Sequence, residues 1–284
     1  MSEKLLTIGM STYDDFNGVY FSVQALRMYH DIVNTDQVEI LVLDNNPSSN
    51  HGSETKSFIE GWAKGRYIPL NDTPASFNKY KIVNHANGKY VLIIDSHVLL
   101  EKNSIDYLLD YYKDNPDCKN LIQGPLLYDD LSNYSTEFKK EWSGDMFGVW
   151  GNNTEGYATQ KPFEIYMQGM GLCSFEKKNW PGISSHFKGF GAEEGYIAEK
   201  FRRNGGQNIC IPQLRWVHRF GRPDGVPYPL ILEDRVWNYF VGWLDITQDP
   251  EHQMIKDIYK YFEQKIPPNS IDNILKLAIS RTLG

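Results

Sequence analysis

Residues 90–100 read Tyr-Val-Leu-Ile-Ile-Asp-Ser-His-Val-Leu-Leu. This apolar run of strand length stops abruptly at Asp95 and His97, after which apolar residues resume. A carboxylate and an imidazole two residues apart, just past a buried strand, can converge on one divalent metal ion. This pair of donors suits Mn²⁺ and similar ions better than Ca²⁺. The tripeptide alone leaves another interpretation open, in which Asp95 caps a turn and His97 is an ordinary loop histidine.

Length and composition place the chain among ordinary globular proteins. Its 284 residues can form one large domain or two small ones, with a substantial core. Hydrophobic residues make up 41% and charged residues 23% of the chain. The net charge of −7 argues against a surface coated in basic residues for nonspecific nucleic-acid binding, although it leaves room for a local basic groove.

The sequence gives few signs of export or of membrane insertion. The three cysteines are far apart and form no C-x-x-C motif, so neither a disulfide framework nor a zinc knuckle is indicated. We find no signal-peptide pattern, and no apolar run approaches the roughly 18 residues of a membrane span. We therefore expect no membrane span and a cytoplasmic location, in a bacterium or a phage-infected host. The oligomeric state stays open.

Strand and helix patterns alternate through the first third of the chain. Apolar runs of strand length are separated by segments with helical spacing of apolar residues, which is typical of βαβ units on a parallel sheet. Nearly continuous apolar strands indicate a sheet covered on both faces. The expected strands are 5–10, 38–43, 67–70 and 90–95, and the expected helices are 16–30, 54–65 and 78–86.

Polar clusters follow three of these strands. Thr12 ends the first strand, Asp44 and Asn45 end the second, and Asp95 and His97 end the fourth. Parallel strands bring these clusters to one edge of the sheet, where open α/β sheets bind ligands. No G-x-G-x-x-G follows the first strand and no Walker A sequence exists, so neither phosphate-binding fingerprint is present.

The helix and strand patterns are less regular in the second half of the chain, except near its C-terminal end. Residues 129–165 are polar and aromatic, and we expect long loops and short strands there. Glu193 and Glu194 open a helix, where acidic residues are favoured by the helix dipole whether or not they have a catalytic role. The region 214–229 combines basic residues with Gly and Pro, as in a mobile loop facing an anion. Other expected elements are a helix over 105–112, strands over 121–128, 168–175 and 209–212, and helices over 194–204, 232–245, 252–264 and 271–283.

The ordered set of motifs resembles GT-A-fold glycosyltransferases of the family 2 type, from about residue 4 to residue 245. Within that group it is most similar to the polypeptide N-acetylgalactosaminyltransferase branch. Asp95-Ser96-His97 is similar to the D-x-H metal motif of that branch. The other motifs are Ser11-Thr12-Tyr13, Asp44-Asn45-Asn46, and a run from Phe190-Gly191-Ala192-Glu193-Glu194 through Phe201-Arg202 and Gly205-Gly206 to Val217-His218-Arg219.

The resemblance implies a role for each matching residue. It places Thr12, Asp44, Asn45 and Asp95 at the nucleotide sugar, and Arg219 and Arg222 at the diphosphate. The metal ligands it implies are Asp95, His97 and His218, although His218 can also be read as a core histidine. Glu193 and Glu194 are the catalytic candidates. Glu194 stands where the branch has Asn and where inverting enzymes usually have Asp, so inversion and retention of configuration both stay open.

The resemblance also implies an architecture and a function. We expect a GT-A domain over residues 1–230, with a mostly parallel, Rossmann-like sheet flanked by helices, and a C-terminal helical extension over 231–284 packed on it. The expected function is metal-dependent transfer of a sugar from a nucleoside-diphosphate donor, UDP before other bases, to a hydroxyl acceptor. The expected cofactor is a divalent metal, Mn²⁺ before Mg²⁺. The alternative is a GT-A-like module that binds nucleotide sugars without transferring them.

The acceptor is open among a glycan, a protein and a hydroxymethylated base of phage DNA. Phe190 and Ala192 replace a Trp and a Gly of the branch, and we find no lectin domain or membrane anchor of the kind that the branch carries, so its acceptor is not carried over. A DNA acceptor would require one groove lined by basic residues, namely Lys79, Lys81, Lys139, Lys140, Lys161, Arg202 and Arg203.

Overall fold

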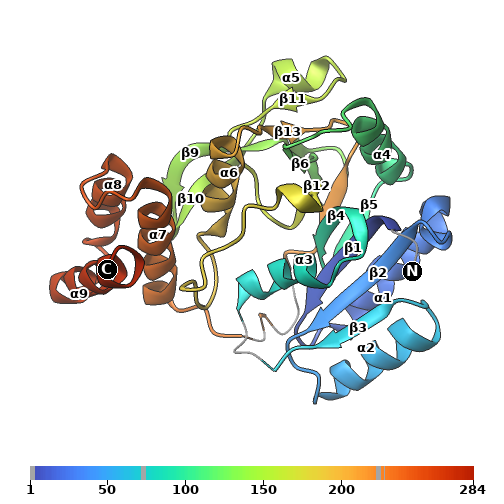
Figure 1. The fold of residues 1–284 in the computed structure, drawn as a ribbon, viewed down its shortest axis with the longest axis horizontal. Coiled ribbons are helices and arrows are strands. Elements are labelled where there is room, and N and C mark those ends of the chain that lie inside the picture. The colour runs from blue at the N-terminus through green and yellow to red at the C-terminus, as the bar shows by residue number, and fades with distance from the viewer. Residues whose placement is uncertain (1–3, 72–74, 222–224, 227) are drawn as a thin grey trace.

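The computed structural model describes residues 4–71, 75–221, 225–226 and 228–284. Its centre is a twisted sheet in the order β11-β13-β6-β12-β4-β1-β2-β3 (Figure 1). Strands β4, β1, β2 and β3 are mutually parallel, and β13 runs parallel to β6. The bounds are β1 Lys4–Thr12, β2 Val38–Asp44, β3 Arg66–Pro69, β4 Gly88–Asp95, β6 Leu121–Gln123, β11 Phe163–Glu164, β12 Leu172–Glu176 and β13 Asn208–Cys210.

Helices cover both faces of this sheet. Along β4, Leu92 and Ile94 belong to one buried apolar cluster, while Val91 and Ile93 belong to another on the opposite face. The mixed α/β class and the mostly parallel sheet that the sequence predicts are therefore confirmed. The first cluster includes residues of α1 (Phe16–Tyr29), α2 (Asn50–Gly61) and α4 (Ser104–Asp114), and the second includes residues of α3 (Ile82–His85), α6 (Glu193–Arg203) and α7 (Leu232–Thr247).

Two helices in the first third of the chain differ from the sequence-based expectation. Helix α2 begins four residues earlier than predicted, because Ser49 caps it by accepting a hydrogen bond from the Gly52 N–H at 3.0 Å. The helix expected over residues 78–86 is instead a 3-10 segment, η2 (Ser76–Lys81), followed by the single turn of α3. The remaining 3-10 segments are η1 (Asp31–Asn34) and η3 (Lys177–Asn179).

The strand expected over residues 121–128 is divided between two sheets. At the break, a side chain on Gly124 would collide with the backbone of Leu214, and Pro125 follows. Strand β6 stays in the central sheet, whereas β7 (Leu126–Leu127) joins a small sheet in the order β5-β14-β7-β8. The other members are β5 (Val98–Leu100), β8 (Tyr134–Ser135) and β14 (Trp216–His218).

Within the region 214–229, where a loop was expected, the small sheet corrects that expectation at Trp216–His218. Strand β14 pairs with β5, and His218 lies opposite Val98. The alternating pattern of β14 is too short to be read as a strand from the sequence. Its pairing brings His218 beside the end of β4, where Asp95 and His97 lie.

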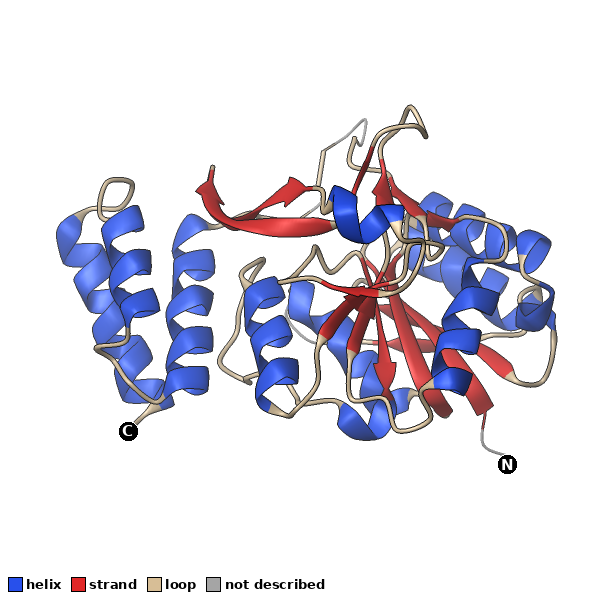
Figure 2. Ribbon diagram, turned by 90° about the horizontal axis from the view of Figure 1, so that it is seen from above, coloured by secondary structure: helices blue, strands red, loops and turns tan. Residues whose placement is uncertain are grey.

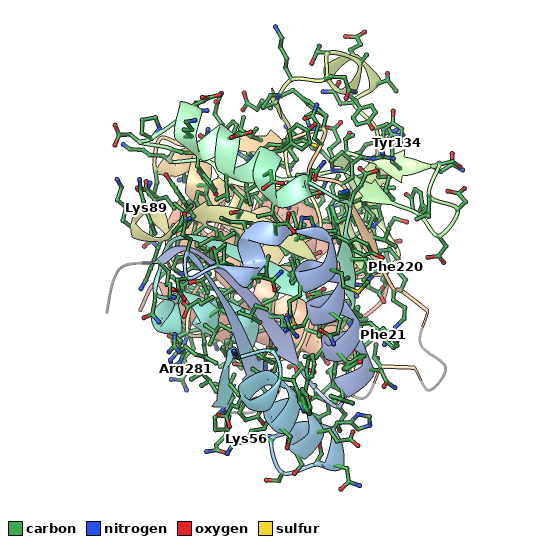
Figure 3. All side chains as sticks on the ribbon, turned by 90° about the vertical axis from the view of Figure 1, so that its right-hand side faces the viewer. Phe21, Lys56, Lys89, Tyr134, Phe220 and Arg281 are labelled. Carbon is green, nitrogen blue, oxygen red and sulfur yellow. The ribbon has the colours of Figure 1, made fainter. Side chains whose placement is uncertain are left out.

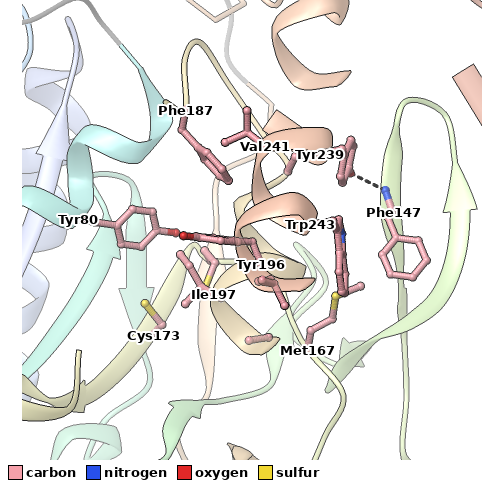
Figure 4. Packing of buried hydrophobic residues seen from close by; sticks show 14 of the residues in the cluster. Tyr80, Phe147, Met167, Cys173, Phe187, Tyr196, Ile197, Tyr239, Val241 and Trp243 are labelled. Atoms are coloured by element: carbon pink, nitrogen blue, oxygen red, sulfur yellow. Dashed lines mark hydrogen bonds between the residues drawn. The ribbon is translucent and has the colours of Figure 1, made fainter. Parts of the chain in front are cut away.

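A hairpin and a group of helices complete the fold. The hairpin consists of β9 (Glu137–Ser143) and β10 (Met146–Gly151), and α5 (Thr154–Ala158) follows it. Figure 2 shows α7, α8 (Gln253–Phe262) and α9 (Pro268–Thr282) side by side at one end of the molecule. Figure 4 shows Tyr239 of α7 bonded to the backbone of the hairpin, its hydroxyl accepting from the Phe147 N–H at 2.7 Å.

Among the described residues, no helix has both the length and the apolar character needed to cross a membrane. The boundary expected near residue 230 stays a prediction.

Candidate active site

A cavity of about 390 Å³ lies at the carboxyl ends of β1 and β4. Ser11, Thr12 and Tyr13 line it from β1, and Asp95, Ser96 and His97 line it from β4. Residues far along the chain close its other side, among them Lys188–Phe190, Tyr228 and Asp234. The cavity therefore lies at the sheet edge where the polar clusters meet.

Asp95, His97 and His218 form a compact group of metal-ligand donors, which we call the ligand trio. One side-chain donor atom from each lies within 4.8 Å of the other two. The His218 Nε2 is 3.4 Å from the Asp95 Oδ2, and the two imidazole rings meet edge to face at 4.7 Å. One carboxylate oxygen and two imidazole nitrogens fit Mn²⁺ or a similar divalent ion.

Asp15 fixes the orientation of His97. Its Oδ2 accepts from the His97 Nδ1 at 2.8 Å and from the Ser96 hydroxyl at 3.1 Å. Burial opposes the charge of Asp15, but His97 and Arg219 outweigh this effect and lower the pKa of Asp15 to about 2. The ionised carboxylate only accepts hydrogen bonds, so in this contact the His97 proton lies on Nδ1.

Lys79 lies on the other side of Asp95. Its Nζ is 3.3 Å from the Asp95 Oδ1 and donates to the Met170 carbonyl at 2.8 Å. Burial opposes the charge on both side chains, yet their mutual attraction, with His218 and His97 also acting on the carboxylate, holds the pKa of Asp95 well below its ordinary value. The pKa of Lys79 is raised for the same reason, with Asp95 and then Glu193 as the main partners.

Glu193 and Glu194 open α6 and are buried together. Neither is among the described residues that line the cavity, but both act electrostatically on Lys79. Burial and the neighbouring Glu193 raise the pKa of Glu194. The Glu193 Oε2 is buried without a hydrogen-bond partner among the described residues. Two carboxylates with unlike environments are suited to different roles in proton transfer.

Three of the residues expected at the nucleotide sugar differ in their access to the cavity. Thr12 and Asn45 line it, and the Thr12 hydroxyl has no hydrogen-bond partner among the described residues. Asp44 is only 1% exposed. Its two oxygens accept from the Asn46 N–H at 2.9 Å and from the Tyr67 hydroxyl at 2.7 Å. Asp44 therefore supports the turn that carries Asn45.

Arg219 is adjacent to the ligand trio and is tied to it. Its Nη2 donates to the Asp15 Oδ1 at 2.9 Å, and its backbone N–H donates to the His97 carbonyl at 3.2 Å. The next residue, Phe220, has its ring 4.2 Å from the His218 ring and lies exposed on the face that also carries Phe21 (Figure 3). Arg222 lies outside the described residues.

Asp15 and Lys79 are the two site residues that the sequence did not reveal. Asp15 reads as a helix cap, and it does cap α1 by accepting from the Gly18 N–H at 3.2 Å. Lys79 reads as one more basic residue of a polar segment. A lysine placed shortly before a strand that ends in a metal motif is the only available signal, and it is weak.

Comparison with known proteins gives a family and a fold. The family model described as glycosyl transferase family 2 matches residues 7–147. None of the curated protein sequences compared with the chain matches it significantly. Several solved structures match nearly the whole chain at low sequence identity.

GalNAc-T7 with UDP, GalNAc and Mn²⁺ is 12% identical with a TM-score of 0.70, and the match covers 98% of this chain and 56% of that one. S. aureus TarS, residues 1–349, in complex with UDP-GlcNAc is 12% identical with a TM-score of 0.61, over 98% of this chain and 81% of that one. The mannosyltransferase PcManGT from Pyrobaculum calidifontis, in complex with GDP-Man and Mn²⁺, is 13% identical with a TM-score of 0.56. This match covers 99% of this chain and 75% of that one.

The chain thus spans 56% of the length of GalNAc-T7. At sequence identities this low, the structural matches show the fold alone. The family model covers the segment that carries β1, β2 and the Asp95–His97 motif. Residues 7–147 therefore match glycosyl transferase family 2, and the chain has the GT-A fold of the glycosyltransferases to which it is similar.

Proposed function

We propose that the protein transfers a sugar from a nucleoside-diphosphate donor to a hydroxyl group, with a divalent metal held by Asp95, His97 and His218. The observation that carries this proposal is the ligand trio at the rim of the cavity between β1 and β4. UDP is the first choice of donor nucleotide, because two of the three structural relatives described above contain UDP or a UDP-sugar. Mn²⁺ is the first choice of metal, because two of them contain it.

The side chains supply the electrostatics that such a transfer needs. The leaving nucleoside diphosphate develops negative charge, which a bound divalent metal stabilises. Arg219 adds a second positive charge at the same side of the cavity, and Asp15 holds its guanidinium in place. Thr12 and Asn45 offer a hydroxyl and an amide to the nucleoside.

Glu193 is our preferred base if the reaction inverts configuration. The raised pKa of Glu194 leaves less of that residue ionised near neutral pH, so less of it is available to accept a proton. Glu193→Gln should then lower kcat by about 100-fold or more, with a smaller effect of Glu194→Gln. If the reaction retains configuration, the leaving phosphate serves as base, and both variants should keep most of their activity. The anomeric configuration of the product, measured by NMR, distinguishes the two cases.

Charge pairing favours a glycan or a protein over DNA as acceptor. Lys79 is buried against Asp95, so it offers no charge to a DNA backbone. Arg202 and Arg203 both pair with Glu199, at 2.9 and 3.1 Å. Three of the seven basic residues that a DNA groove would need are therefore already engaged in ion pairs within the protein.

Thermal shift with UDP, GDP and other nucleoside diphosphates, with and without Mn²⁺, tests the proposal. A ligand of the folded state raises the melting temperature according to ln(1 + [L]/Kd). We expect a shift with UDP that requires Mn²⁺ and is lost in His97→Ala. The absence of a shift with every nucleotide would exclude the donor site.

The alternative function is a binding module without transfer activity. A transferase releases UDP from its sugar donor slowly even without an acceptor, because water can replace the acceptor hydroxyl. Donor binding without UDP release in the presence of Mn²⁺ would favour the binding module.

A further inference from the structure

Lys79 shares a carboxylate with the ligand trio. The Asp95 Oδ1 faces the Lys79 Nζ at 3.3 Å, and the Asp95 Oδ2 faces the His218 Nε2 at 3.4 Å. The Lys79 side chain is only 10% exposed, so water does little to screen its charge. The one carboxylate of the trio is therefore neutralised by a cation that belongs to the protein.

The structure holds Lys79 in this place. Its ammonium donates to the Met170 carbonyl at 2.8 Å. On either side, the Asn78 amide donates to the Asn45 side chain at 2.8 Å, and the Tyr80 ring stacks on Trp180 at 5.4 Å. Both neighbours anchor η2, and the hydrogen bond to Met170 holds the ammonium of Lys79 beside Asp95.

The second carboxylate near the trio is neutralised as well. Asp15 pairs with Arg219 at 2.9 Å and bonds to His97. The remaining acidic groups close to Lys79 are Glu193 and Glu194, and the raised pKa of Glu194 shows that this pair resists carrying two charges. A divalent cation that binds the ligand trio without a nucleotide therefore finds little net negative charge to balance its own positive charge.

We propose that Lys79 is a positioning residue that, by neutralising Asp95, makes metal binding depend on the nucleoside diphosphate. The trio alone then binds a divalent cation weakly, and the negative charges of the diphosphate supply the missing attraction. Coupling between two ligands is reciprocal, so the metal strengthens nucleotide binding by the same factor. This inference rests on the proposed function, since it assumes that a nucleoside diphosphate binds in the cavity.

Calorimetric titration of Mn²⁺ tests the role of Lys79 without any activity measurement. The proteins are the wild type, Lys79→Met and Lys79→Arg, each with and without UDP. In the wild type, UDP should tighten Mn²⁺ binding at least tenfold. Lys79→Met should bind Mn²⁺ alone at least tenfold more tightly than the wild type does, because a fixed positive charge in hydrogen-bonding range of a ligand has been removed. The tightening by UDP should shrink by the same factor, and Lys79→Arg should behave like the wild type.

Lys89→Met is the matched control. Lys89 lies near the opposite end of β4 from Asp95, on the side of the molecule away from Phe220 (Figure 3). It also pairs with an acidic residue, Glu176, at 3.7 Å. This variant should leave both Mn²⁺ titrations unchanged.

The outcomes separate the two proposals. If Lys79→Met binds Mn²⁺ alone no better than the wild type, Lys79 has a structural role and the inference is wrong, whatever UDP does. A general loss of folding cannot imitate the expected result, because it would weaken metal binding. If neither the wild type nor Lys79→Met binds Mn²⁺ or UDP in any combination, the proposed function itself fails, and the inference fails with it.

Discussion

At the scale of single residues, the site depends on which atom of each side chain is already engaged. Asp15 accepts a hydrogen bond from the Nδ1 of His97 and so fixes the orientation of its ring. Asp95 divides its two oxygens between Lys79 and His218. Hydrogen bonds from neighbouring residues such as Asp15 and Lys79 therefore orient the candidate metal ligands.

Asp15→Asn tests the orientation of His97. Asparagine caps a helix as well as aspartate does, so α1 should persist. If the asparagine oxygen keeps the cap at Gly18, its NH2 group replaces the Oδ2 acceptor that faces the His97 Nδ1, and Mn²⁺ affinity in the presence of UDP should fall about 10- to 100-fold. Titration calorimetry measures this change. Asp14→Asn is the control, because Asp14 accepts from the Asn46 side chain and not from His97; an equal loss there would contradict the role of Asp15.

The raised pKa of Glu194 predicts how the free energy of unfolding changes with pH. Its pKa is raised in the folded protein, so the folded state favours the protonated form. The stability from this group is fully present below the pKa of the unfolded chain, near pH 4, and is lost as the pH rises toward the raised value. Glu194→Gln stays neutral throughout and should lose less stability than the wild type between pH 5 and pH 8.

Urea denaturation at the two pH values measures the difference for Glu194→Gln. Glu141→Gln serves as the control, because Glu141 is exposed on β9. Parallel losses in the wild type and in Glu194→Gln would show that Glu194 titrates normally.

The residues that the sequence identified are those that belong to a recognisable motif. Asp95 and His97 stand together after a strand, and His218 belongs to a run that resembles a family pattern. Lys79 and Asp15 have no motif of their own, and their roles arise from contacts with residues 16 and 82 positions away. No local pattern specifies such contacts.

At the scale of elements, the start of α6 combines the two candidate catalytic carboxylates with an unusual backbone. Gly191 has φ of 93°, and Ala192 follows in the left-handed region with φ of 75°. These residues turn the chain so that Glu193 and Glu194 enter the interior. A side chain at Gly191 would also come within 2.9 Å of the Arg235 Nε.

Gly191→Ala should therefore destabilise the protein, by about 1–3 kcal/mol. Urea denaturation provides the measurement. Gly61→Ala is the matched control, because Gly61 is in helix α2 and a methyl group there meets nothing within 4 Å. That variant should be as stable as the wild type or slightly more so. Equal effects of the two substitutions would argue against strain at Gly191.

The sequence predicted most of the elements, but not every partner of each strand. The nearly continuous apolar character of β1, β2 and β4 is a strong local signal. By contrast, Leu121 to Leu127 look like one strand, and the sequence does not reveal the close approach of Gly124 to the Leu214 backbone at the point where β7 leaves the central sheet. Pairing between β14 and β7 is a long-range event that hydrophobic periodicity does not encode.

At the scale of the whole molecule, the C-terminal helices share their core with the rest of the chain. Val236, Phe240 and Leu244 of α7 are fully buried in the cluster that also contains residues of α6. Figure 4 shows Val241 and Trp243 of α7 close to Tyr196 and Ile197 of α6. We therefore propose that residues 231–284 are an integral part of one folding unit.

Removal of residues 231–284 should prevent cooperative folding. The truncated chain would expose the face of α6 that α7 covers, and we expect it to bind a hydrophobic dye and to lack a sharp thermal transition. Removal of α9 alone, by ending the chain at residue 265, should lower the melting temperature less. A truncated chain that melts sharply near the wild-type temperature would place a true domain boundary near residue 230.

The ligand trio also has a consequence for the order of folding. His97 and His218 are about 120 residues apart in the chain and meet only through the pairing of β5 with β14. Contacts between such distant segments form late, because a long loop must close, at a cost in entropy, before the contacts can stabilise the chain. In a refolding experiment, Mn²⁺ would consequently be captured in the slowest phase, well after the helices have formed. The bound metal thus reports when the chain has reached its native topology.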